Sequence, residues 1–225
     1  MAGGPEAVAR SHRSFAVGPG FASALTILGG SRPGSIVWAL SFESADMRGS
    51  ISPFNYLVKR TFLRPREVIQ FIQECQRRAP VDATEISKAT LREAEERYSG
   101  WKVEDLKQEY RNRYPEFESA LEALRQGFHR YDSLAEFERY LQERISDLMA
   151  KMGARRVIEL LFNASVIGVR LGNAGTARFR CEDSDLLLPA AGGVYVHQSL
   201  YRGLSIRERR GGDAGAAADD WLEDA

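Results

Sequence analysis

Three arginines stand close together at a point where the sequence predicts the start of a helix. Arg60, Arg64 and Arg66 flank Pro65, and proline is favoured at the first helical position because its missing N–H would have no partner there. Apolar residues follow at helical spacing: Val68, Ile69, Phe71, Ile72 and Cys75. Guanidinium groups beside the N–H groups of a helix N-terminus suit an anion such as phosphate. The alternative is a solvated basic turn, in which these arginines pair with Glu67 and nearby acids.

The other residue types that carry chemistry form no recognisable pattern. The three histidines, His12, His129 and His197, have no Ser, Cys or Asp at a spacing that suggests a triad or a metal site. Cys75 and Cys181 make neither a disulfide framework nor a metal motif, which suits a reducing, cytoplasmic location. The sequence therefore predicts no catalytic residue and no metal ligand.

A glycine-rich stretch at residues 29–35 invites comparison with a phosphate-binding loop. It lacks the G-x-x-x-x-G-K-[ST] pattern, because no lysine follows Gly34. The whole chain has no Walker A lysine and no strand that ends in a Walker B acidic pair. Phosphoryl transfer needs a backbone cradle, a lysine and a magnesium ligand. We therefore expect that the chain is not an enzyme and binds no cofactor by itself.

The arginine cluster belongs to a longer motif. Residues 60–71, RTFLRPREVIQF, fit the pattern R-x-x-x-R-P-R-[DE]-x-I-x-F, which resembles the start of the lid in bacterial P-loop ATPases of the AAA+/STAND type, relatives of the origin-recognition ATPases. Residues 98–115 and 158–170 also resemble this family. The resemblance covers residues 53–206 and implies a helical lid followed by a winged helix.

The resemblance also implies roles for the arginines. In this family an arginine of the motif is a second sensor that reaches the γ-phosphate; Arg66 matches that position best, Arg64 second, and Arg60 begins the motif. The three could instead form an arginine finger offered to a neighbour. Since the ATPase core is missing, the chain is expected to be a fragment, a truncated product, or a partner of an ATPase subunit. ATP and Mg²⁺ would then be bound only with that partner core.

The predicted winged helix is locally basic. Residues 151–210 contain ten Lys or Arg against five Asp or Glu. Arg155 and Arg156 lie at the start of the expected recognition helix, whereas Arg170, Arg178 and Arg180 lie in the expected wing. Phosphate contacts from a helix and wing of this kind predict duplex DNA as a partner. Winged helices of multidomain ATPases also bind protein or lock the nucleotide site, so both possibilities stay open.

Composition limits the other classes of function. The 225 residues contain 31 Lys and Arg and 31 Asp and Glu, so there is no overall attraction to nucleic acid or anionic membrane. A hydrophobic content of 44% with 28% charged residues fits a helix-rich globular protein. No apolar run is long enough to span a bilayer, and we expect no membrane partner.

Periodicity predicts a mainly α fold, with a helical lid-type bundle followed by a winged helix-turn-helix and a small β-hairpin. We expect helices after Pro65, at residues 82–98 behind a capping box, at 101–114 beyond Gly100, at 117–128, at 134–149 behind a second capping box, and at 154–164 after Gly153. Strands are expected at residues 166–171 and 177–181, joined as a hairpin, and at 193–197.

Four regions follow from this reading. Residues 1–52 are a poorly ordered segment or the remnant of an ATPase core, and residues 53–114 form the lid-like domain. Residues 115–206 form the winged-helix domain, and residues 207–225 form a flexible acidic tail. The predicted function is a non-catalytic C-terminal regulatory portion of a P-loop ATPase, which couples nucleotide state to partner or nucleic-acid binding. The alternative is a stand-alone winged-helix DNA-binding regulator.

Overall fold

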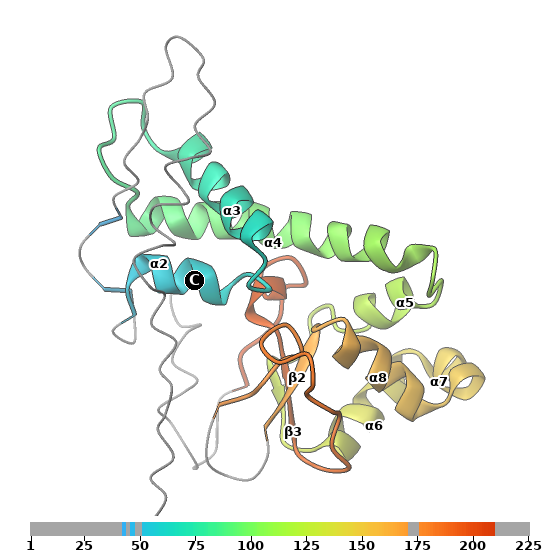
Figure 1. Cartoon of the computed structure of the whole chain (residues 1–225). Helices are drawn as coiled ribbons and strands as arrows, with labels where there is room; N and C mark the ends of the chain where they lie inside the picture. Colours follow the sequence, from blue (N-terminus) through green and yellow to red (C-terminus); the bar gives the residue numbers. More distant parts are fainter. Residues whose placement is uncertain (1–41, 44–45, 48–50, 171–175, 210–225) are drawn as a thin grey trace, which may run out of the picture. The chain divides into compact units, whose positions relative to one another are not determined.

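A computed structural model describes residues 42–43, 46–47, 51–170 and 176–209 of the chain. The described residues belong to one compact unit and are mainly helical, with a small antiparallel sheet (Figure 1). This confirms the predicted fold class. The expectations for residues 1–41 and for the tail from residue 210 fall outside the described residues.

Two helices lead into the long central one. Helix α2 (Pro53–Lys59) begins at Ser52, whose hydroxyl accepts a hydrogen bond from the backbone N–H of Asn55. Helix α3 (Pro65–Arg78) begins at the predicted proline. Its predicted apolar face is largely buried, with Val68, Phe71, Ile72 and Cys75 inside. The local signals therefore predicted α3 correctly, whereas α2 was not predicted.

Helix α4 (Lys88–Arg111) corrects two predictions. The predicted capping box at residues 82–85 does not start a helix; α4 begins after Ser87, whose side chain accepts from the N–H of Thr90. Gly100 does not end the helix, because the buried residues Tyr98, Ser99, Lys102 and Val103 on either side hold it in one piece. The result is a single helix of 24 residues, about 36 Å long, in place of two short ones.

The second half of the described chain begins with four shorter helices. They are α5 (Phe117–Glu122), α6 (Leu134–Arg144), α7 (Ser146–Met152) and α8 (Ala154–Asn163). The capping box at Ser133 is confirmed, since its hydroxyl accepts from the N–H of Glu136. The predicted helix at residues 117–128 stops at Glu122, and the one at 134–149 is broken at Ile145, whose ψ of 47° is not helical. Gly153, with a φ of 86°, separates α7 from α8 as expected.

The sheet corrects the predicted hairpin. It contains β1 (Arg130–Tyr131), β2 (Ile167–Arg170) and β3 (Gly193–Val196) in the order β1-β3-β2, with both pairings antiparallel. Strand β2 pairs with β3 along its whole length, whereas residues 177–181 supply only the single bridge between Val169 and Arg178. Strand β1, which no alternating pattern predicted, gains its place from pairing with β3. A short 3₁₀ turn, η1 (Gln198–Leu200), follows β3.

These elements follow the order of a winged helix: α5, β1, helices α6 to α8, β2, a long loop and β3. As in that fold, the last strand, β3, lies in the middle of the sheet. Helix α8 takes the place of the recognition helix, and the loop between β2 and β3 is the wing. Helix α4 packs against α2 and α3 and also against α5 and η1 (Figure 1). One apolar core contains Phe62, Val103 and Leu106 together with the core of the winged helix. The predicted boundary near residue 114 stays a prediction, and the structure shows one core on both sides of it.

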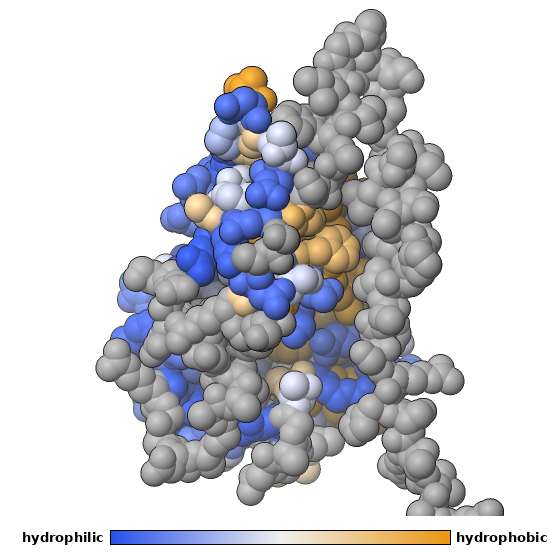
Figure 2. Space-filling view, turned by 90° about the vertical axis from the view of Figure 1, so that its left-hand side faces the viewer, coloured by the Kyte–Doolittle hydropathy of each residue, from blue (hydrophilic) through white to orange (hydrophobic). Residues whose placement is uncertain are grey.

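The described surface is largely hydrophilic on the face in Figure 2, with a group of hydrophobic residues near the middle and a separate hydrophobic spot at the top. No helix in the described part of the chain has the length and apolar character needed to cross a bilayer.

Candidate functional site

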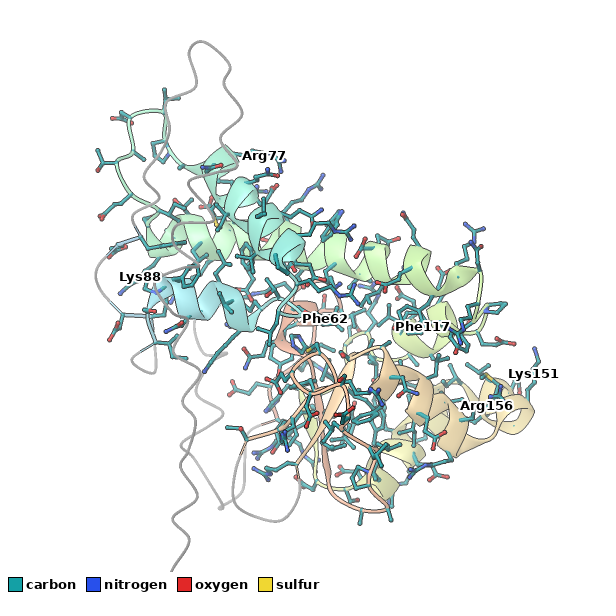
Figure 3. The ribbon with its side chains drawn as sticks, viewed as in Figure 1. Phe62, Arg77, Lys88, Phe117, Lys151 and Arg156 are labelled. Carbon is teal, nitrogen blue, oxygen red and sulfur yellow. The ribbon has the colours of Figure 1, made fainter. Side chains whose placement is uncertain are left out.

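The predicted anion site lies in the turn that leads into α3. Leu63 has a φ of 56°, a conformation that residues with a branched side chain seldom adopt, and its side chain is 47% exposed. The Thr61 hydroxyl stabilises the turn by donating to the Val58 carbonyl and accepting from the Leu63 N–H. Phe62, labelled in Figure 3 next to the start of α3, turns inward and is 2% exposed. The turn therefore projects Leu63 and the following arginine outward while Phe62 anchors it.

A fully buried carboxylate, Glu67, fixes this turn to α4. Its oxygens accept hydrogen bonds from the Phe62 N–H at 2.7 Å, from Lys102 Nζ at 2.7 Å and from the Tyr98 hydroxyl at 3.2 Å. Lys102 is also fully buried, and its Nζ lies 4.2 Å from the centre of the Phe62 ring. Burial and the nearby Glu67 charge raise the pKa of the Tyr98 hydroxyl. This ion pair sets the position of the start of α3.

Arg60 lies inside the protein. Its Nε donates to Glu95 Oε1 at 2.6 Å, and its guanidinium carbon is 3.4 Å from the centre of the Tyr56 ring. The Tyr56 hydroxyl donates to the second Glu95 oxygen, also at 2.6 Å, and Arg60 is only 3% exposed. In this arrangement Arg60 joins α2 to α4, and its guanidinium is enclosed among protein groups.

Arg64 and Arg66 remain at the surface, each next to an acid of α4. Arg64 donates to both oxygens of Glu109, at 3.1 and 3.3 Å, and its side chain is 44% exposed. Arg66 makes one longer ion pair, 3.6 Å to Asp105, and its side chain is 66% exposed. The pairing with acids agrees with the alternative stated for these residues. Arg66 has the most accessible guanidinium of the three.

Buried polar groups also connect α4 to the winged helix. The Ser99 hydroxyl donates to the Ser199 carbonyl at 2.7 Å and accepts from the Gly203 N–H at 2.8 Å. The His197 ring packs edge-on against Phe62 on one side and Phe179 on the other, at centroid distances of 4.7 and 4.6 Å. The start of α3 is therefore in direct contact with the end of β3.

His197 is uncharged in this position. Burial lowers its pKa to about 3, and the positive charges of Lys102 and Arg60 add to the effect. Its Nδ1 accepts from the Ser199 N–H at 3.1 Å, so the proton of the neutral ring lies on Nε2, which is 3.8 Å from Cys181 Sγ. Burial raises the pKa of the Cys181 thiol to about 11, which leaves it protonated and unreactive.

The arginines predicted to contact DNA do not form one surface of free charges. Arg155 donates to Glu159 at 2.8 Å and to the carbonyls of Leu188 and Pro189 at 2.9 and 3.0 Å, so it ties α8 to the wing. Arg178 pairs with Asp183 at 2.7 Å, within the wing. These two guanidinium groups therefore have partners inside the described protein.

The other three have weaker attachments. Arg170 lies over the Tyr195 ring, with 5.2 Å between its guanidinium carbon and the ring centre. Arg180 donates to the Leu186 carbonyl at 3.2 Å. The side chain of Arg156, labelled on α8 in Figure 3, is exposed and makes no hydrogen bond or ion pair with another described side chain.

Sequence reasoning missed three groups of the site: the buried partners Glu67 and Lys102, and Arg113 beside α8. Lys102 falls four residues before Leu106 and four after Tyr98, both of which are buried, so a lysine in the apolar stripe was the available signal. Glu67 was noted only as an acid near the arginines. No local signal places Arg113, which follows the end of α4, next to a helix some 40 residues later in the chain.

The fold and these contacts define a winged-helix module whose core continues into a preceding helical domain. That preceding part has a known counterpart: residues 23–107 match the family model of the FunZ-associated C-terminal helical domain. The match covers less than half of the chain and, within the described residues, takes in α2, α3 and most of α4. No match was found to a curated protein or to a solved structure. This part of the chain is similar to a C-terminal helical domain, and the match itself carries no link to a P-loop ATPase.

Proposed function

We propose that the chain is a non-catalytic C-terminal regulatory portion of a P-loop ATPase, and that it couples the nucleotide state of an ATPase core to contact with a partner or nucleic acid. The observation that carries the proposal is the rigid path from Arg66 to the winged helix. Arg66 is exposed at the start of α3, which Glu67 fixes to α4, and Ser99 of α4 bonds to the segment after β3. A displacement of Arg66 would therefore be coupled to the winged helix through these packed, hydrogen-bonded groups.

Two further observations support this proposal. The motif of residues 60–71 resembles the lid motif of AAA+/STAND-type ATPases, and the matching family is described as a C-terminal helical domain. In the proposed complex the partner core supplies the phosphate cradle, ATP and Mg²⁺, while Arg66, with Arg64 beside it, approaches the γ-phosphate. Arg60 acts in this proposal through the position of α2, because its guanidinium is buried against Glu95.

The test needs the chain together with a P-loop ATPase core encoded beside its gene. We expect the chain alone to bind no ATP analogue, and the complex to turn over ATP at a rate that Arg66→Ala lowers at least tenfold. Arg77→Ala is a matched control, since Arg77 lies at the other end of α3 and is 65% exposed, against 66% for Arg66. Equal turnover by the wild-type and Arg66→Ala complexes would contradict the proposal.

The second candidate is a stand-alone winged-helix DNA-binding regulator. It is favoured by the winged-helix order of elements and by Arg156, which is exposed on the helix that would contact DNA. Salt-dependent binding of the isolated chain to duplex DNA, weakened by Arg156→Ala, would support this function. Substitutions of Arg155 and Arg178 are less informative in this test, because both side chains are engaged in contacts within the protein.

A further inference from the structure

The described structure contains a groove of about 410 Å³ between the end of α4, the outer face of α8 and the wing. Three guanidinium groups from these three elements line it: Arg113, Arg156 and Arg180. They lie 24 to 67 positions apart in the sequence, so only the fold brings them together. Tyr110, Tyr114 and Asn163 add two aromatic rings and an amide to the walls.

The described residues that line this groove include three guanidinium groups against one carboxylate, so the groove carries a net positive charge. Glu159 is the one acid among the lining residues, and it is paired at 2.8 Å with Arg155. A second acid, Glu116, forms an ion pair with Lys151 at 3.1 Å. A hydrogen bond from its own backbone N–H, the bond to Lys151 and, to a smaller extent, the charge of Arg156 lower the pKa of Glu116. Among the described residues, the Arg113 guanidinium contacts only the Tyr114 ring, with 5.4 Å between its carbon and the ring centre. The Arg180 guanidinium donates a hydrogen bond to a carbonyl oxygen, that of Leu186. Three guanidinium groups without a carboxylate partner form a site for a phosphate-bearing ligand.

The shape of the groove argues against a DNA duplex. Helix α8 is buried at Val157, Ile158, Leu160, Leu161 and Phe162, and its open side carries Arg155, Arg156, Glu159 and Asn163, of which Arg155 is bonded to the wing. The residues Tyr110 and Tyr114 flank that same face. A helix that reads duplex DNA must enter a major groove about 12 Å wide, and the end of α4 stands beside α8 where the duplex would have to approach.

Aromatic rings next to arginines instead suit unpaired bases. Proteins that bind single strands combine a basic groove for the backbone with aromatic side chains on which bases stack. Tyr110 stacks on Phe117 at 4.4 Å, and Tyr114, which is half-buried, stacks on Tyr110 at 6.2 Å. We propose that this groove binds single-stranded nucleic acid, with Arg113, Arg156 and Arg180 on the phosphates and Tyr114 against a base.

In this proposal the groove is the place where the chain contacts nucleic acid, which the proposed function did not specify. Its role in the cell rests on that proposed function. Binding is measured with the full chain alone, without an ATPase core, so its failure and the failure of the ATPase proposal can be told apart. The assay is fluorescence anisotropy with a labelled 12-nucleotide oligo(dT) and, in parallel, a 12-base-pair duplex. Unlabelled oligonucleotide and a phosphopeptide of equal charge serve as competitors.

We expect the single strand to bind more tightly than the duplex. The triple variant Arg113→Ala, Arg156→Ala, Arg180→Ala should bind at least tenfold more weakly and lose about 2 from the slope of log affinity against log salt, about 0.7 for each phosphate contact. The matched control is Arg139→Ala, an exposed arginine of α6 outside the groove. Tyr114→Ala should weaken binding about tenfold, while Tyr114→Phe, which retains the ring, should not.

Three results would overturn the inference. They are tighter binding of the duplex, unchanged affinity of the triple variant, and displacement of the oligonucleotide by the phosphopeptide as effectively as by unlabelled oligonucleotide. Far-UV circular dichroism and thermal melting show whether each variant is folded. The three arginines are at the surface or half-buried, so the triple variant is expected to melt like the wild type.

Discussion

The helical region α2–α4 and the winged helix use their charged residues in opposite ways. The helical region buries Arg60 with Glu95 and Lys102 with Glu67, at distances of 2.6 and 2.7 Å. The described winged helix has an apolar core, and its exposed arginines include Arg156, whose side chain makes no ion pair with a described residue. A chain with balanced overall charge can still present local positive charge, because residues 151–210 contain ten Lys or Arg against five Asp or Glu.

The difference also separates two mechanical roles. Buried ion pairs are costly to break, because the remaining charge stays in a medium of low dielectric constant. The Glu67 pair therefore holds the start of α3 in one position relative to α4. Exposed arginines contribute little to stability and are free to bind a ligand. The helical region therefore keeps α3 at a fixed position relative to α4, whereas the groove beside α8 presents charged groups to a ligand.

The largest expected effect is on the buried pair. Glu67→Ala leaves Lys102 without its closest carboxylate partner and removes the acceptor for the Phe62 N–H, so we expect the free energy of unfolding to fall by about 3–5 kcal/mol. Urea denaturation followed by circular dichroism measures this. Glu109→Ala, which removes the exposed partner of Arg64, should cost less than about 1 kcal/mol. Equal losses in both variants would contradict the contrast between the two regions.

The next effect concerns the contact between the regions. A Cβ atom on Gly203 would lie 2.5 Å from the Ser99 carbonyl oxygen and 2.8 Å from Val103 Cγ2, so Gly203→Ala should destabilise the protein by about 1–3 kcal/mol. A Cβ atom on Gly100 would have no neighbour within 4 Å, and this residue lies inside α4. Gly100→Ala should therefore raise stability by about 0.5–1 kcal/mol. Opposite signs in thermal melts would support a continuous α4 packed on the winged helix; destabilisation by Gly100→Ala would contradict it.

The last effect depends on pH. The pKa of His197 is about 3 in the folded protein and about 6.5 in the unfolded chain. Between these values the unfolded chain binds a proton that the folded protein does not, so the free energy of unfolding falls as the pH is lowered. From pH 7 to pH 5 the loss should be about 2 kcal/mol, measured by urea denaturation at each pH.

A comparison with His197→Asn isolates this residue. Asparagine can still accept the hydrogen bond from the Ser199 N–H but cannot be protonated in this range. The variant should therefore show a shallower pH dependence than the wild type. The same slope in both proteins would mean that other groups cause the loss of stability.

The sequence by itself determined the features that depend on neighbouring residues. Pro65 starts α3, Ser133 caps α6 and Gly153 divides α7 from α8, because each signal acts on the backbone within one turn of a helix. The mainly helical class followed from these local signals, whereas strand β1 and the pairing of the sheet did not. The resemblance of residues 60–71 directed attention to the turn before α3.

Only the tertiary structure decided which groups meet. It made α4 continuous through Gly100, paired β2 with β3, and enclosed Arg60 with Glu95, 35 positions away. It also left the Arg156 side chain without an ion pair among the residues that the structure describes and placed Arg113 in the same groove. The physical reason is that ion pairing and strand pairing depend on distances in space between residues far apart in the chain, and local backbone preferences carry no information about those distances.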